Sequence, residues 1–179
     1  MLNDIFAHED MLPTLLAAAG DPDVKEKLLK GMKVGDKTFK VHLDGYNITD
    51  ALAGKAPNPR HEFFYWNDDG SLVGLRYDNW KIVFQEQRAH GFDVWAEPFV
   101  PLRVPKIFNL RSDPFEEADH IGMDYKHWQI DRVFLLVPAQ EYIGNYIATF
   151  KEFPPSQKVG SFSLDQVLEK LQDASTSGK

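Results

Sequence analysis

Two short clusters of polar residues could carry chemistry. Asp68 and Asp69, preceded by Asn67 and followed by Gly70, offer paired carboxylates, which are hard oxygen ligands suited to a metal ion. No spaced third and fourth ligands follow, as they would in a calcium loop. Because Asp and Gly are residues that tight turns select, the sequence favours a turn here over a metal site.

The second cluster is His8, Glu9 and Asp10. It does not match the zinc motif H-E-x-x-H, because position 12 is Leu. Acidic side chains in the first turn of a helix are stabilised by the helix dipole. We therefore interpret this cluster as the beginning of a helix.

The sequence lacks the motifs of other common active sites. There is no cysteine, which excludes disulfides, thiolate metal sites and a cysteine nucleophile. The six histidines are scattered, with no pair at ligand spacing. No G-x-S-x-G elbow surrounds the candidate serines Ser71, Ser112, Ser156, Ser161 and Ser163. From the residues alone we expect no catalytic, cofactor-binding or metal-ligating residue in this chain.

Composition limits the classes of partner. The 179 residues include 20 Lys and Arg against 27 Asp and Glu, a net charge of −7, which argues against nucleic-acid binding. The only basic cluster, Lys25, Lys27, Lys30 and Lys33, is interrupted by Glu26 and is interpreted as a solvated helix face. Hydrophobic residues make up 43%, enough to build a core for one domain, with or without an attached arm.

Two further patterns concern membranes and export. The longest apolar run, residues 133–137, is far shorter than the roughly 20 residues needed to span a bilayer. Residues 1–10 carry acids where a signal peptide needs a basic start and an apolar run. We expect no membrane span and no export signal in the chain as written.

Local patterns predict helices and a hairpin in the first third. Leu12, Leu15, Leu16 and Ala19 form one apolar stripe, which predicts a helix over residues 8–19 that ends at Gly20. Further expected elements are a charged helix at 24–30, a hairpin pairing 32–34 with 38–43, and a short helix at 48–53.

A β-sheet is predicted next. Residues 63–66 are continuously aromatic, as in a strand buried on both faces. The following two strands should share one apolar face across a turn at residues 78–79. That face comprises Val73, Leu75, Tyr77, Trp80, Ile82 and Phe84. Residues 104–110 should supply a fourth strand, so we expect a small antiparallel sheet with packed helices, an α+β fold.

Helical periodicity returns from residue 123. One stripe comprises Ile130, Val133, Phe134 and Val137, and Pro138 should kink or end that helix. The next stripe comprises Ala139, Tyr142, Ile143, Tyr146, Ile147 and Phe150. Ser163 and Gln166 form a capping box that should open a last helix with Leu164, Val167, Leu168 and Leu171 on one side. Residues 174–179 should form a disordered tail.

Four segments, taken in order, resemble the C-terminal part of the sulfatase family, in particular the arylsulfatases. Residues 10–20 resemble D-x-x-P-T-L-L-x-x-A-G, and residues 43–55 resemble D-G-x-x-L-x-x-x-L-x-G. Residues 60–83 resemble a hairpin that ends in R-x-x-x-W-K, and residues 108–116 resemble L-Y-N-L-x-x-D-P-x-E. Each motif alone is weak, but the order and spacing of all four are specific. The resemblance covers about residues 1–120.

The resemblance implies hydrolysis of sulfate esters. In that family the nucleophile is a formylglycine hydrate made from a C/S-x-P-S-R motif, and a calcium ion polarises the sulfate. Here the nearest approach is Ser112, Asp113 and Pro114, followed by Phe115 and Glu116 instead of Ser and Arg. The resemblance therefore implies a C-terminal fragment that holds no cofactor itself, lacks the nucleophile and metal site, and is inactive alone.

The resemblance also suggests a division of the chain. Residues 1–22 would be a helix from the edge of a missing catalytic domain, and residues 23–120 the sulfatase C-terminal subdomain. Residues 121–173 would be a helical extension, followed by the tail at 174–179. The expected partner is that catalytic domain, or a chain carrying it. Without it, the exposed stripe of residues 8–19 should lead to self-association. Intact family members are often periplasmic or secreted.

Two alternatives stay open. The chain could be the C-terminal part of a related phosphodiesterase or phosphonate hydrolase, which this region does not separate from a sulfatase. It could also be a non-catalytic docking module. The candidate surface is then the loop at residues 87–105, where His90, Phe92, Trp95 and Phe99 accompany Arg88 and Arg103. The simpler interpretation is a loop packed on its own sheet.

Overall fold

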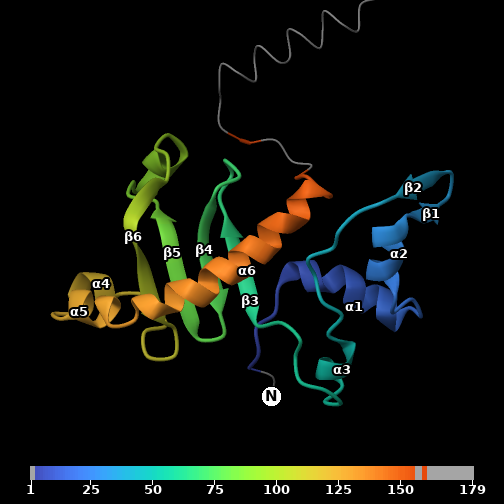
Figure 1. Ribbon diagram of the computed structural model, residues 1–179, viewed down its shortest axis with the longest axis horizontal. Helices are drawn as coiled ribbons and strands as arrows, with labels where there is room; N and C mark the ends of the chain where they lie inside the picture. The colour runs from blue at the N-terminus through green and yellow to red at the C-terminus, as the bar shows by residue number, and fades with distance from the viewer. Residues whose placement is uncertain (1–2, 156–158, 161–179) are drawn as a thin grey trace, which may run out of the picture.

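The computed structural model describes residues 3–155, 159 and 160, and it has the predicted α+β fold (Figure 1). The main antiparallel sheet has the strand order β3-β4-β5-β6: β3 (Glu62–Trp66), β4 (Leu72–Tyr77), β5 (Trp80–Glu86) and β6 (Val100–Asn109). Before it come η1 (His8–Asp10), α1 (Met11–Ala18), α2 (Val24–Lys30), the hairpin β1 (Met32–Val34) and β2 (Lys37–Phe39), and α3 (Thr49–Leu52). Beyond β5 lie η2 (Gly91–Trp95), α4 (Ala118–Ile121), α5 (Tyr125–Ile130), η3 (Val133–Leu135), α6 (Leu136–Ala148) and η4 (Thr149–Lys151).

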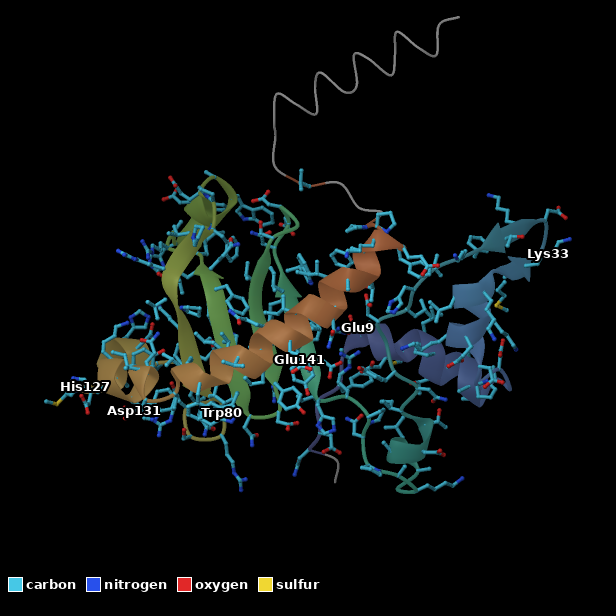
Figure 2. The ribbon with its side chains drawn as sticks, in the orientation of Figure 1. Glu9, Lys33, Trp80, His127, Asp131 and Glu141 are labelled. Atoms are coloured by element: carbon cyan, nitrogen blue, oxygen red, sulfur yellow. The ribbon has the colours of Figure 1, made fainter. Side chains whose placement is uncertain are left out.

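The centre of the sheet carries the core. Leu75 on β4 pairs in register with Ile82 on β5, and the two side chains are buried. Helix α6 crosses the sheet (Figure 1 and Figure 2) and places buried Ala139 against this pair. Phe64, Phe84, Leu135, Leu136 and Ile143 pack around the cluster. The apolar face predicted for β4 and β5 is therefore confirmed at its centre.

Helix α5 covers the open edge of β6. The Tyr125 hydroxyl donates to the carbonyl oxygen of Ile107 at 3.0 Å and accepts from its amide nitrogen at 3.1 Å. The Gln129 side-chain amide donates to the Pro105 carbonyl oxygen at 2.6 Å. Unpaired backbone groups on an edge strand invite pairing with another chain. These side chains satisfy three of those groups, which explains why Gln129 is a buried polar residue.

The aromatic strand is at the opposite edge of the sheet. The sequence indicated burial on both faces, but β3 pairs only with β4 and its side chains are partly exposed. Trp66 is 38% exposed. The aromatic rings pack against α6 on one side only, as in the stacking of Phe64 on Tyr146 with centroids 4.2 Å apart. The prediction of a doubly buried strand was wrong because aromatic runs also suit an edge strand under a helix.

The C-terminal helices differ from the expected pattern. Pro138 lies in the first turn of α6, where its missing N–H has no helical partner, so it does not kink the helix. The stripe of Ile130, Val133, Phe134 and Val137 faces outward, each side chain between 43% and 70% exposed. The sheet instead receives Leu135, Leu136, Ala139 and Ile143. The second predicted stripe is correct at Ala139, Ile143, Tyr146 and Phe150, whereas Tyr142 and Ile147 are exposed. The break at residues 131–135 shifts the helical phase between the two stripes.

The region predicted as a loop at 87–105 is partly a strand. β6 begins at Val100, which pairs with Glu86, and Pro101 pairs with Gln85. The turn η2 projects from this hairpin, and its Phe92 and Trp95 are 92% and 84% exposed. These two aromatic rings therefore do not pack on the sheet, contrary to the simpler interpretation.

Helix α1 confirms the expected exposed apolar surface. Pro13 and Thr14 are buried, whereas Leu12 and Leu15 are 49% and 58% exposed. Neighbouring Met11 is also exposed. We define Met11, Leu12 and Leu15 as the α1 apolar face.

Several expectations lie outside the described residues. They are the capping box at Ser163 and Gln166, the helix it was expected to open and the tail at 174–179. The proposed boundaries at residues 22, 120 and 173 remain predictions. Within the described part of the chain, no helix has the length and apolar character needed to cross a membrane.

The α1 apolar face should bind a hydrophobic dye and promote self-association. Replacing Leu12→Gln and Leu15→Gln together should lower dye fluorescence and apparent mass in light scattering, because exposed apolar area drives both effects. The free energy of unfolding should change by only about 0.5 kcal/mol, since neither side chain is buried. Leu52→Gln, at an equally exposed leucine in α3, is the matched control. A monomeric wild type that binds no dye would contradict this prediction.

Candidate functional site

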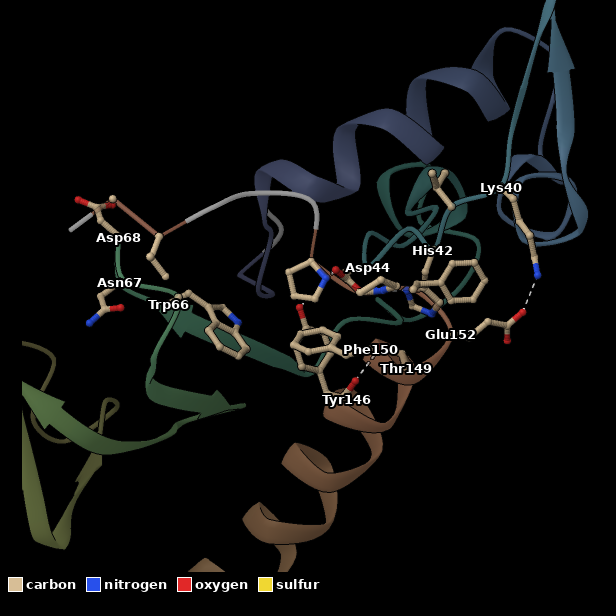
Figure 3. Close-up of a pocket in the computed structure, with 17 residues that line it drawn as sticks. Lys40, His42, Asp44, Trp66, Asn67, Asp68, Tyr146, Thr149, Phe150 and Glu152 are labelled. Carbon is tan, nitrogen blue, oxygen red and sulfur yellow. Dashed lines mark hydrogen bonds and ion pairs between the residues drawn. The ribbon is translucent and has the colours of Figure 1, made fainter. Parts of the chain in front are cut away.

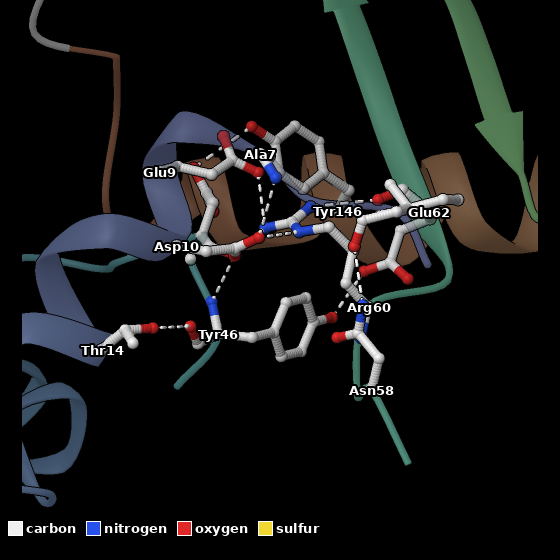
Figure 4. Close-up of polar contacts among 12 residues, drawn as sticks. Ala7, Glu9, Asp10, Thr14, Tyr46, Asn58, Arg60, Glu62 and Tyr146 are labelled. Atoms are coloured by element: carbon white, nitrogen blue, oxygen red, sulfur yellow. Dashed lines mark hydrogen bonds and ion pairs between the residues drawn. The ribbon is translucent and has the colours of Figure 1, made fainter. Parts of the chain in front are cut away.

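A buried ion pair lies where the N-terminal helices meet the sheet (Figure 4). Arg60, just before β3, donates from Nε to Asp10 Oδ2 at 2.7 Å and from Nη2 to Asp10 Oδ1 at 2.6 Å. The Asp10 side chain is 0% exposed and that of Arg60 is 2% exposed. Arg60 Nη2 also lies 2.7 Å from Glu9 Oε1. This two-point geometry is the strongest form of an arginine–carboxylate contact.

Backbone groups complete the surroundings of Asp10. Its Oδ1 accepts from the Tyr46 amide at 2.7 Å, and its Oδ2 accepts from the Ala7 amide at 3.0 Å. The segment that carries Tyr46 approaches closely because Gly45 has no side chain. A Cβ at position 45 would lie 1.9 Å from the carbonyl oxygen of Glu9. Three chain segments thus converge on one carboxylate.

These contacts set the charge states of the two acids. Burial alone would raise the pKa of Asp10, but the hydrogen bonds from Arg60, Tyr46 and Ala7 hold it below its usual range. Burial raises the pKa of Glu9, and the charge of Arg60 only partly opposes this. The site therefore holds Asp10 firmly as a carboxylate while Glu9 accepts a proton more readily than a free glutamate.

Lys25 and Tyr46 form the other wall of the site. Lys25 Nζ donates to the Gly45 carbonyl oxygen at 2.6 Å and lies 5.0 Å from the centroid of the Tyr46 ring. Arg60 covers the same ring at 4.8 Å, and the Tyr46 hydroxyl donates to Glu62. Burial lowers the pKa of Lys25 and raises that of Tyr46. Lys25 is thus a packed residue, unlike the solvated lysine that the sequence indicated.

Two cavities adjoin this network. A smaller one, of about 240 Å³, includes Glu9, Lys25, Arg60 and Glu62 in its lining. A larger one, of about 1070 Å³, extends toward the β3–β4 turn and the end of α6 (Figure 3). Both are lined in part by His42, Asp44, Trp66 and Tyr146. Burial and the neighbouring Asp44 carboxylate raise the pKa of Tyr146 to about 12, so this phenol is a hydrogen-bond donor at neutral pH.

Apart from Glu9 and Asp10, which meet Arg60, the residues singled out from the sequence serve local structure. Asn67 Oδ1 accepts from the amides of Asp69 and Ser71 at 3.1 and 2.8 Å, so the Asp68–Asp69 segment is the predicted turn. His8, Glu9 and Asp10 form η1, as expected for a helix start. Ser112 donates to the Asn109 carbonyl oxygen at 3.1 Å. Within the described residues, no three His, Asp or Glu side chains are placed to hold a metal ion.

Residue types alone did not indicate that Asp10, Arg60 and Tyr46 would meet. Each is a common surface residue type, and Asp10 lies 36 residues from Tyr46 and 50 residues from Arg60 along the chain. Asp10 and Arg60 do begin two of the four family-like segments, and Tyr46 lies within a third. That shared position was the available signal.

Known sulfatases are similar to part of the chain in sequence and in structure. No family model matches the chain. Human arylsulfatase A is 25% identical over 124 residues, which cover 63% of this chain and 22% of that protein. The PsFucS1 sulfatase from Pseudoalteromonas sp. aligns in structure with a TM-score of 0.48 and 23% identity, covering 65% of this chain and 22% of that one. The chain thus spans about a fifth of each protein. The match to arylsulfatase A confirms the resemblance to the C-terminal portion of a sulfatase.

Arg60→Ala should lower the free energy of unfolding by about 3 to 5 kcal/mol, because it leaves the buried Asp10 carboxylate without its partner. Arg60→Lys should recover only part of this loss, since an ammonium cannot make the two-point contact. The measurement is urea unfolding followed by circular dichroism.

Arg88→Ala is the control, because Arg88 pairs with Glu86 at the surface and its side chain is 61% exposed. Arg88→Ala should lower the free energy of unfolding by only about 0.2 to 1 kcal/mol. If Arg60→Ala and Arg88→Ala lower the free energy of unfolding equally, the buried pair stabilises the fold no more than a surface ion pair does.

Asp10 should also govern part of the acid sensitivity. Its folded-state pKa lies below the ordinary 3.8. The stability it contributes is therefore present above about pH 4 and lost as pH falls through the lower, folded pKa. Asp10→Asn should have a lower free energy of unfolding than wild type at pH 7, and this difference between the two proteins should become smaller toward pH 2. Urea unfolding at a series of pH values measures this; a gap that is constant with pH would contradict it.

Proposed function

We propose that this chain is the C-terminal, supporting part of a sulfuric ester hydrolase, an enzyme that hydrolyses sulfate esters. The observation that carries the proposal is the match to human arylsulfatase A over 63% of the chain. The four family-like segments lie in the described part of the fold, and two of them are joined by the Asp10–Arg60 pair. This buried contact gives a structural role to the first residue of each of these two segments.

The proposal includes inactivity of the chain alone. A nucleophile in hydrolysis needs an activating base or a lowered pKa. The chain has no cysteine, and Ser112 bonds to a backbone carbonyl oxygen instead of a base. The resemblance implies calcium for the intact enzyme, but the described Asp, Glu and His side chains do not converge as a metal site would require. We therefore derive no catalytic step from this chain's own residues.

The catalytic domain, or a chain carrying it, is the proposed partner. The α1 apolar face is the surface proposed to meet it, because Leu12 and Leu15 lie outward on a helix whose start is fixed by Asp10. The Asp10–Arg60 pair holds this helix against the sheet. A partner covering α1 would therefore also be fixed relative to β3.

One observation favours a second candidate, the non-catalytic docking module. Phe92 and Trp95 are almost fully exposed on η2, and aromatic residues are enriched at interfaces. In this alternative the β5–β6 hairpin would contact a separate catalytic chain. It differs from the first candidate in needing η2, and not α1, for assembly.

The test is hydrolysis of para-nitrophenyl sulfate. The purified chain should release product no faster than buffer, with or without added calcium. The reading frame extended upstream of Met1 should restore turnover, and its sequence should contain an in-frame C/S-x-P-S-R. Faster hydrolysis of a para-nitrophenyl phosphodiester by the extended protein would favour the phosphodiesterase alternative. Turnover by the isolated chain that persists through chelation controls would overturn the proposed inactivity.

A further inference from the structure

The larger cavity has a wall of aromatic rings. Trp66 at the end of β3 meets Tyr146 on α6 and Phe150 on η4 (Figure 3). The centroids of Tyr146 and Phe150 are 5.3 Å apart, those of Trp66 and Phe150 5.9 Å, and those of Trp66 and Tyr146 6.2 Å. The three rings are tilted against each other and all line the cavity. A ligand in the cavity would therefore contact both faces and edges of aromatic rings.

The same cavity is acidic. Among its described lining residues, three are acidic, Asp44, Asp68 and Glu152, and one is a lysine, Lys40. That lysine is already neutralised, because its Nζ lies 2.7 Å from Glu152 Oε1. Among the described lining residues, Asp44 and Asp68 form no ion pair with a lysine or arginine. Asp44 Oδ1 lies 3.0 Å from His42 Nδ1, and its Oδ2 accepts from the Tyr146 hydroxyl at 3.3 Å. An anion entering here would meet repulsion.

The chain itself places an ammonium group on an aromatic ring at this cavity. Lys40 Nζ lies 5.5 Å from the centroid of the Phe153 ring, and both residues belong to the lining. A cation near an aromatic face is attracted by the ring's quadrupole. This internal contact places an ammonium group against one aromatic ring of the lining, Phe153, beside the wall of Trp66, Tyr146 and Phe150.

We propose that the cavity binds a small organic cation, an ammonium group carried on an apolar body. The body would lie against Trp66, Tyr146 and Phe150, and the charge would lie toward Asp44 and Asp68. The aromatic rings and the carboxylates both attract a positive charge. Both attractions become stronger when the bound cation is shielded from water. The volume of about 1070 Å³ is large enough for a small molecule. This site goes beyond the proposed sulfatase function and does not depend on it.

The experiment compares choline with dimethylbutanol, in which carbon replaces the charged nitrogen. Titration of each into the full chain, followed by tryptophan fluorescence and nuclear magnetic resonance, should show at least tenfold tighter binding of choline, in the range expected for combined cation–π and ionic contacts. Raising the salt concentration to about 1 M should weaken choline binding and leave dimethylbutanol unaffected, because salt screens exposed charges.

Variants separate the contributions of rings and charge. Trp66→Ala should weaken choline binding by about tenfold. Asp68→Asn keeps a turn-forming residue and should weaken it by about threefold. Asp69→Asn is the matched control, because Asp69 lies in the same turn but not in the cavity lining, and it should have no effect. Asp68→Asn still tests the proposal if Trp66→Ala fails to fold.

Three outcomes would overturn the proposal. Equal binding of choline and dimethylbutanol would show that charge plays no part. Binding of methyl glucoside in preference to choline would assign the cavity to a neutral sugar. Choline binding that Asp68→Asn leaves unchanged would place the cation elsewhere on the chain.

Discussion

The bidentate contact between Asp10 and Arg60 is the interaction on which the arrangement of the chain depends. Both side chains are removed from water, and a buried charge is tolerated only when it is paired and hydrogen-bonded. Asp10 meets that condition with four contacts: two from Arg60 and one each from the Ala7 and Tyr46 amides. Removing the segment of either charged residue would leave the other charge unpaired in the interior, and removing the Tyr46 segment would take away one hydrogen bond to Asp10. The start of α1, the β2–α3 connection and the entry to β3 must therefore be placed together.

This constraint links the two halves of the molecule. The sheet has its own apolar core under α6, centred on Leu75 and Ile82. The α1 apolar face has no such cover among the described residues. The ion pair fixes the helix in place while leaving its apolar side chains outward. In the function proposed above, this face is where the catalytic domain would pack. This fits a chain that spans about a fifth of arylsulfatase A.

The aromatic residues contribute in two ways. Tyr125 and the Trp128 that stacks on it belong to α5, which covers the β6 edge. Trp66, Tyr146 and Phe150 instead line a cavity between β3 and the end of α6. The high content of aromatic residues by itself predicts neither of these two roles. The difference arises because one edge of the sheet has a helix that satisfies its backbone groups, whereas the other is crossed only by the far end of α6.

The sequence by itself determined the α+β class, the β4–β5 hairpin with its apolar face, the turn at Asp68 and Asp69, and the resemblance to sulfatases. Turn chemistry and two-residue periodicity are read over short distances, and motif order is read along the chain without knowledge of contacts. Only the tertiary structure decided that Asp10 and Arg60 are buried together, that β3 is an edge strand and that the Val133–Val137 stripe faces outward. Those outcomes depend on which segment comes to lie beside which, because burial of a charge or a ring is a property of neighbours distant in sequence.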